Sequence, residues 1–244
     1  MAVSNGGKAI NNIRHPEADS GQKKLLIMAG GREMEIEVRD LPEEFIDWQV
    51  STRLEGIRSF LEGSPRMNAF GAHLPVMSTV DTTTGTFPVN SAGKGVGLVV
   101  RKDLLEEYTL KFEGLINDGL KKGWHKTMGK RLEALLEYYS DPSKFDRTLL
   151  SSLELYAKRT YSNVLVDPRA TLLYVGIGEG GTKSYAVHCV AELVPPGDLF
   201  YRFAAAIHDL FHVPAKQQYP FAYRLWVSEV YDKAPGRRAS ERLV

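Results

Sequence analysis

Apolar positions along the chain follow two spacings, one of every second residue and one of every three to four residues. Tyr185 to Val194 alternates at a period of two, as strands do, and a glycine-rich run separates it from apolar Leu172 to Val175. Because glycine accepts positive φ at little steric cost, this pattern predicts a β-hairpin. Lys24 to Met28 and Met34 to Arg39 predict a second hairpin with the same plan.

Five segments carry their apolar residues at helical spacing instead. The first begins with Asp40 and Glu43 at capping-box spacing, and the last begins after Asp198 as N-cap and ends before Pro214. The predicted helices cover about residues 40–62, 103–119, 124–139, 145–156 and 199–213. We expect the middle three to pack as a layer with short connections.

Shorter apolar runs predict further strands at Val96 to Val100, Val164 to Val166, Thr171 to Val175 and Tyr223 to Tyr231. Together these elements predict an α+β protein. Its sheet, antiparallel or mixed, is built from two β-hairpins plus further strands, and a layer of about five helices covers it.

The composition of the chain changes along its length, and this divides it into three parts. Residues 1–23 form a polar N-terminal arm, residues 24–232 a single α+β domain, and residues 233–244 a basic C-terminal tail. Within the domain, residues 64–95 are rich in Gly, Thr, Ser and Pro and predict a long loop. Loops of that length are often functional, so we expect this one to contact a partner.

The overall charge and the cysteine content indicate the partners and the cellular compartment of the protein, but not its reaction. The chain has 31 Lys and Arg against 30 Asp and Glu, so a polyanion would have to bind a local patch. The single Cys189 excludes an internal disulfide and favours a reducing compartment. No apolar run approaches about 20 residues, so we expect no membrane partner and a cytoplasmic location, or one within a particle assembled there.

Two histidines in the last predicted helix have the spacing of a metal-binding pair. His208 and His212 are four residues apart and share a helix face, with Glu229 as a candidate third ligand for zinc or another divalent metal. Asp209 points away from the apolar stripe of this helix. The alternative is that both histidines interact with free carbonyl groups in the last helical turn.

The glycine run before Ser184 resembles a phosphate-binding loop in composition. Gly178, Gly180, Gly181 and Lys183 are the residues that would surround a phosphate or nucleotide. However, Thr182 stands where a P-loop has glycine, and the following residues alternate like a strand, whereas a P-loop opens a helix. A plain hairpin turn is the favoured interpretation.

One basic stripe occurs in the chain, at the second helix of the predicted layer. Lys122, Lys126 and Lys130 recur every four residues and are followed by Arg131, which is the clustered charge that nucleic-acid backbones require. A solvated helix face accounts for the same pattern.

The sequence lacks a nucleophile elbow, a redox Cys-x-x-Cys pair and an EF-hand loop, and it assigns no catalytic residue. The leading hypothesis is therefore a non-enzymatic subunit of a viral, phage or ribonucleoprotein-type particle. Such a subunit, a homo-oligomer or part of a multi-subunit complex, would use its termini and long loop to contact neighbours. The alternatives are a metal-dependent enzyme built on the two histidines and a nucleic-acid-binding protein that uses the basic stripe.

Overall fold

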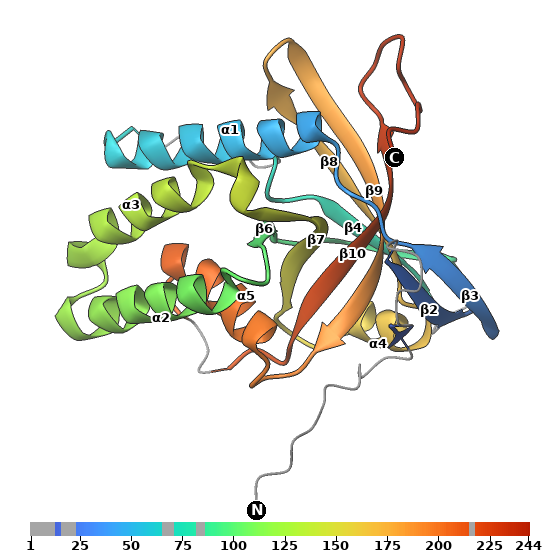
Figure 1. The fold of residues 1–244 in the computed structure, drawn as a ribbon, viewed down its shortest axis with the longest axis horizontal. Coiled ribbons are helices and arrows are strands. Elements are labelled where there is room, and N and C mark those ends of the chain that lie inside the picture. The colour runs from blue at the N-terminus through green and yellow to red at the C-terminus, as the bar shows by residue number, and fades with distance from the viewer. Residues whose placement is uncertain (1–12, 16–22, 65–70, 82–85, 215–217) are drawn as a thin grey trace, which may run out of the picture.

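The computed structural model describes residues 13–15, 23–64, 71–81, 86–214 and 218–244, and confirms the predicted α+β class. Ten strands form a three-stranded and a seven-stranded sheet, and both sheets are antiparallel (Figure 1). The predicted hairpin at Lys24 to Arg39 does not join the larger sheet. It belongs to the smaller one, which consists of β1 (Ile13–Arg14), β2 (Lys24–Ala29) and β3 (Arg32–Glu37).

The seven-stranded sheet has the order β5-β4-β8-β9-β10-β7-β6. Its strands are β4 (Val76–Val80), β5 (Val89–Gly93), β6 (Val96–Val100), β7 (Phe145–Glu154), β8 (Arg169–Gly178), β9 (Gly181–Val194) and β10 (Phe221–Asp232). β9 and β10 lie at the centre and supply much of the core, including Val187, Ala191, Leu225 and Val227.

The connection between β5 and β6 requires this sheet to curl. The two strands stand at opposite ends of the strand order, which in a flat sheet would separate them by about 29 Å. Only Lys94 and Gly95 join Gly93 to Val96, and such a link reaches about 11 Å at most. The two edges of the sheet therefore come together, as in a partly closed barrel, and Lys94 lies at the junction.

Four of the five α-helices in the described residues gather on one side of the larger sheet, and the β2–β3 hairpin lies on the other (Figure 1). These four are α1 (Glu43–Leu61), α2 (Leu105–Lys122), α3 (Met128–Tyr139) and α5 (Leu199–Phe211). The fifth, α4 (Arg159–Val166), packs on β4, β5 and β9. Its buried Asn163 donates to Thr79 of β4 at 3.0 Å.

The prediction of a helix over residues 145–156 is wrong, because this segment is strand β7 between β10 and β6. Its last six residues are all buried, so both faces of the strand are covered and the period of two disappears. Leu149 and Leu153 then mimic helical spacing. The strand predicted at Val164 to Val166 is also wrong, since these residues end α4.

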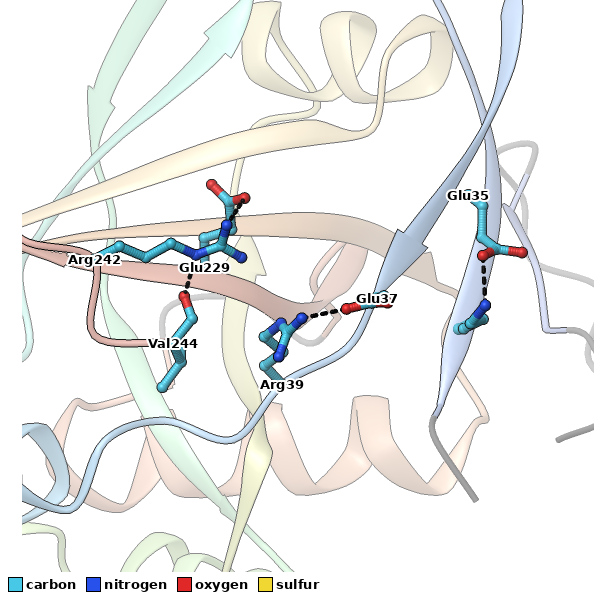
Figure 2. Close-up of polar contacts among 7 residues, drawn as sticks. Glu35, Glu37, Arg39, Glu229, Arg242 and Val244 are labelled. Carbon is cyan, nitrogen blue, oxygen red and sulfur yellow. Dashed lines mark hydrogen bonds and ion pairs between the residues drawn. The ribbon is translucent and has the colours of Figure 1, made fainter. Parts of the chain in front are cut away.

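The segments expected to contact neighbouring subunits are partly folded onto their own chain. The predicted loop 64–95 contains the paired strands β4 and β5. The C-terminal tail pairs with β10, with Leu243 N donating to Val230 O at 2.7 Å and Asp232 N donating to Glu241 O at 2.9 Å. Figure 2 shows Arg242 of the tail bonded to Glu229 and to Val244. Most of the predicted N-terminal arm lies outside the described residues.

Candidate functional site

A pocket of about 340 Å³ lies between α2 and α5, and Gln218 and Tyr219 line it beyond the end of α5. α5 contributes positions that recur every four residues, Tyr201, Ala205 and Asp209, so one helix face lines the pocket. Ile116 of α2 and the small side chains of α5 make part of the lining apolar. Asp209 points away from the apolar stripe of α5, as predicted, and the structure adds that it faces this pocket.

Asp209 is the most strongly organised polar group of the pocket. Its Oδ1 accepts from the Tyr219 hydroxyl at 2.5 Å and lies 3.0 Å from His208 Nδ1. The Tyr219 hydroxyl is also 3.3 Å from that nitrogen. A carboxylate can only accept, so the contact between His208 Nδ1 and Asp209 is a hydrogen bond in which Nδ1 donates. The carboxylate is thus oriented by two donors, and its side chain remains 14 % exposed.

Tyr201 fixes the segment that carries Tyr219. Its hydroxyl donates to the Tyr219 carbonyl at 2.8 Å and accepts from the Tyr219 amide at 3.0 Å. Burial raises the pKa of the Tyr219 hydroxyl, and its hydrogen bond to the Asp209 carboxylate raises the pKa further. Tyr219 therefore stays protonated and serves as a fixed donor to Asp209 rather than as a base.

The charge of the pocket is negative. Arg202 is held by Glu113 through two hydrogen bonds, of 2.9 Å from Nε and 2.6 Å from a terminal nitrogen. This bidentate pair neutralises itself, which leaves Asp209 as the remaining charged group of the lining. The pocket consequently favours a ligand that presents a cation or a strong hydrogen-bond donor.

The two predicted histidine ligands do come together at the end of α5, with ring centroids 4.9 Å apart. Burial lowers the pKa of His212, and neighbouring His208 lowers the pKa further. A third histidine, His73, was not predicted. Burial, followed by the charges of Arg53 and His212, lowers the pKa of His73 to about 4, so this imidazole is neutral near pH 7.

The proposed third ligand, Glu229, does not join His208 and His212. Tyr219, which contacts His208, lies just before Phe221 at the start of β10. Glu229 is eight residues further along this strand, about 26 Å at strand spacing. There it binds Arg242 at 3.2 Å and accepts from Tyr231 at 3.0 Å (Figure 2). In the described part of the chain, no three His, Cys, Asp or Glu side chains are placed to hold a metal ion.

The predicted basic stripe is not one helix face. Gly123, at φ +104°, ends α2, and a short 3-10 helix (η1, His125–Thr127) precedes α3. Lys122, Lys126 and Lys130 therefore belong to three different elements. Arg131 is not available to a phosphate, because it is only 1 % exposed and stacks on Trp124 at 3.6 Å.

The glycines of the predicted phosphate loop serve the β8–β9 hairpin. Gly178 pairs with Gly181, and no helix follows, so the amide arrangement of a P-loop is absent. Gly180 and Gly181 adopt φ values of +81° and +113° at the turn. At Gly178 a Cβ would stand 2.8 Å from Trp48, whose indole nitrogen donates to Ile177 O at 3.3 Å. Lys183 lies beside this turn on β9.

The sequence named His208 only as a candidate metal ligand, and it did not identify Tyr219, Tyr201 or Glu113. Tyr219 follows Pro214 in a segment without periodicity, and Glu113 lies on a different helix. A charged residue on the polar side of an otherwise apolar helix was the one available signal for the pocket.

No family model matches the chain, and no curated protein matches it. Two solved structures were found. HupZ of Group A Streptococcus, in a tagged form, is 12 % identical, with 68 % of this chain and 90 % of that chain covered at a TM-score of 0.38. An FMN-binding protein from Syntrophomonas wolfei subsp. wolfei is 10 % identical, with 80 % and 95 % covered at 0.39. Because both TM-scores are below 0.5, no residue role is transferred from either.

The hypothesis of a non-enzymatic particle subunit is contradicted in its premises, because segments expected to contact neighbouring subunits fold onto their own chain. The C-terminal tail pairs with β10, and strands β4 and β5 of the expected loop pair within the larger sheet. In the described ranges, no helix is long and apolar enough to cross a membrane.

Proposed function

We propose that the protein binds a small organic molecule with an ammonium or other strongly donating group in the pocket between α2 and α5. The observation that carries this proposal is the Asp209 carboxylate, oriented by Tyr219 and His208 and facing a pocket of about 340 Å³. A carboxylate held in place before the ligand arrives loses little conformational entropy on binding.

The remaining lining defines the rest of this ligand. Ile116, Ala205 and Ala206 offer an apolar contact for a short carbon skeleton. Asn117 and Gln218 supply amide groups that can orient a second polar group. FMN, which carries a phosphate group, is a poor fit, because Arg202 is already paired with Glu113 and Asp209 would repel the phosphate.

Replacing Asp209 with asparagine should weaken amine binding about 10- to 100-fold, because the carboxylate charge is lost and only a neutral amide oxygen remains to accept from the ammonium group. The measurement is isothermal titration of wild-type protein and variant with primary amines and with alcohols of the same carbon skeleton. Glu107→Gln, an exposed change on α2, removes the same charge and should leave binding unchanged.

Equal affinity of amines and alcohols for the wild-type protein would contradict the proposed ligand class. Retention of FMN by the wild-type protein and its loss from Asp209→Asn would contradict it as well. Tyr219→Phe provides a finer test. It removes one of the two donors that orient Asp209, so it should weaken amine binding by less than the Asp209 variant does.

A further inference from the structure

The corner between α2 and α3 is the most exposed basic part of the helical layer. Figure 1 shows this connection at one end of the layer, away from the seven-stranded sheet. From Leu120 to Lys130 every residue is exposed except Trp124 and Thr127. The α2–α3 corner is defined here as residues 119–132.

The corner carries net positive charge, and the acidic residues Asp118 and Glu133 stand just outside its two ends. It contains Lys121, Lys122, Lys126 and Lys130, all exposed, and no Asp or Glu. Lys122 pairs with Asp118 just before it, at 2.6 Å, but both side chains are exposed and such a pair is weak. Among the described residues, no ion pair is seen for the other three lysines.

Two large apolar side chains stand among these lysines. Leu120 is 59 % exposed and Met128 is 38 % exposed, although both belong to helices that bury apolar faces elsewhere. A phosphate backbone gains little from a leucine or a methionine. A lipid surface gains from both, because its headgroups attract lysines and its acyl boundary accepts apolar side chains.

The frame that presents these side chains is rigid. The Arg131 guanidinium donates to Trp124 O at 3.0 Å, to Thr127 Oγ1 at 2.7 Å and to Leu210 O at 2.9 Å. The bond to Leu210 ties the corner to α5, and the other two hold the corner together. Because the corner is already ordered, docking it on a surface costs little backbone entropy.

We propose that the α2–α3 corner docks on an anionic phospholipid bilayer surface, with the lysines at the headgroups and Leu120 and Met128 at the acyl boundary. This extends beyond the small-molecule pocket and does not depend on it. It also departs from the expectation that no membrane is involved, which rested on the absence of a spanning segment. Surface docking needs no such segment.

The test is co-sedimentation of the full chain with phosphatidylcholine vesicles that do or do not contain phosphatidylserine. Wild-type protein should bind only the phosphatidylserine vesicles. Removing three lysines in K121Q/K126Q/K130Q should weaken binding on the order of 100-fold, at roughly fivefold per lysine. Leu120→Gln should weaken it roughly tenfold through lost apolar burial.

The matched control, K102Q/K158Q/K233Q, removes the same charge from exposed lysines outside the corner and should bind like wild type. Equal thermal melting of all variants would show that they are folded. Failure of wild-type protein to bind phosphatidylserine vesicles would overturn the proposal, and so would equal losses in the two triple variants. A lysine effect without a Leu120 effect would indicate a purely electrostatic anion surface, such as nucleic acid, and would also overturn it.

Discussion

Replacing Glu154 with alanine should lower the free energy of unfolding by about 3–5 kcal/mol, the largest loss that we expect from a single substitution. The Glu154 side chain, 3 % exposed, accepts from Lys94 Nζ at 2.8 Å and from the Tyr223 hydroxyl at 2.5 Å. It also accepts from the amides of Tyr156 and Ala157, each at 3.0 Å. Alanine would leave a largely buried ammonium group unpaired, and urea unfolding measures the cost.

The same carboxylate gives part of the stability a defined pH dependence. Burial raises the pKa of Glu154, but the hydrogen bonds from Lys94, Tyr223 and the Tyr156 amide outweigh burial and hold the pKa below its ordinary 4.5. A pKa lowered by folding stabilises the protein above the unfolded value. This contribution should therefore be lost as the pH falls from about 4.5 through the folded-state pKa. The difference in the free energy of unfolding between wild type and Glu154→Gln should shrink over the same pH range.

Two further variants distinguish the loss of the buried Glu154 cluster from the loss of an exposed ion pair. Glu137→Ala breaks an exposed pair with Lys111 and should cost less than about 1 kcal/mol. Lys94→Met removes the partner of Glu154 and should destabilise strongly, because a buried carboxylate is then left without its cation. If Glu154→Ala cost no more than Glu137→Ala, the buried cluster would not stabilise the fold.

Replacing Arg131 with alanine should lower the free energy of unfolding by about 3–4 kcal/mol. The guanidinium makes three hydrogen bonds and stacks on Trp124, and the side chain is almost fully buried. Truncation to alanine removes the donor of three hydrogen bonds, so three acceptor oxygens lose their partner. It also leaves a cavity beside the Trp124 ring. Thermal and urea unfolding of the variant provide the measurement.

Arg131→Lys tests whether geometry or charge matters at this position. Lysine keeps the charge but cannot stack a planar group on Trp124 and reach all three acceptors, so most of the loss should remain. Neighbouring Lys130→Ala should change stability by no more than about 0.5 kcal/mol, because its side chain is exposed. A fully stable Arg131→Ala would show that the corner is held by other contacts.

Gly119 packs against the stacked side chains of Arg131 and Trp124. A Cβ there would stand 2.9 Å from the Arg131 guanidinium and 2.9 Å from the Trp124 ring. Glycine is thus required at this position by the close approach of two large side chains. This explains why a helix that otherwise has good helix formers carries a glycine near its end.

The sequence by itself determined the elements that bury one face. Apolar stripes in the sequence predicted α1, α2, α3 and α5, and alternation around a glycine turn predicted the β8–β9 hairpin. These patterns are visible because one face of each element is exposed, so that polar residues recur at a fixed spacing. Five helices were expected and five α-helices are described, but the sets differ. The segment predicted as a helix at 145–156 is strand β7, and the fifth helix is α4 instead. The prediction failed because both faces of β7 are buried, so its apolar residues do not alternate with polar ones.

Only the tertiary structure decided which residues act together. Glu154 and Lys94 are 60 residues apart, and they meet because β6 pairs with β7 in a register that places Val96 opposite Ser152. Tyr219 lies outside α5 and still donates to Asp209 within it. Arg131 looked like a surface cation, yet Trp124 and α5 cover it. Local periodicity records whether a face is buried, but it carries no information about the partner that buries it.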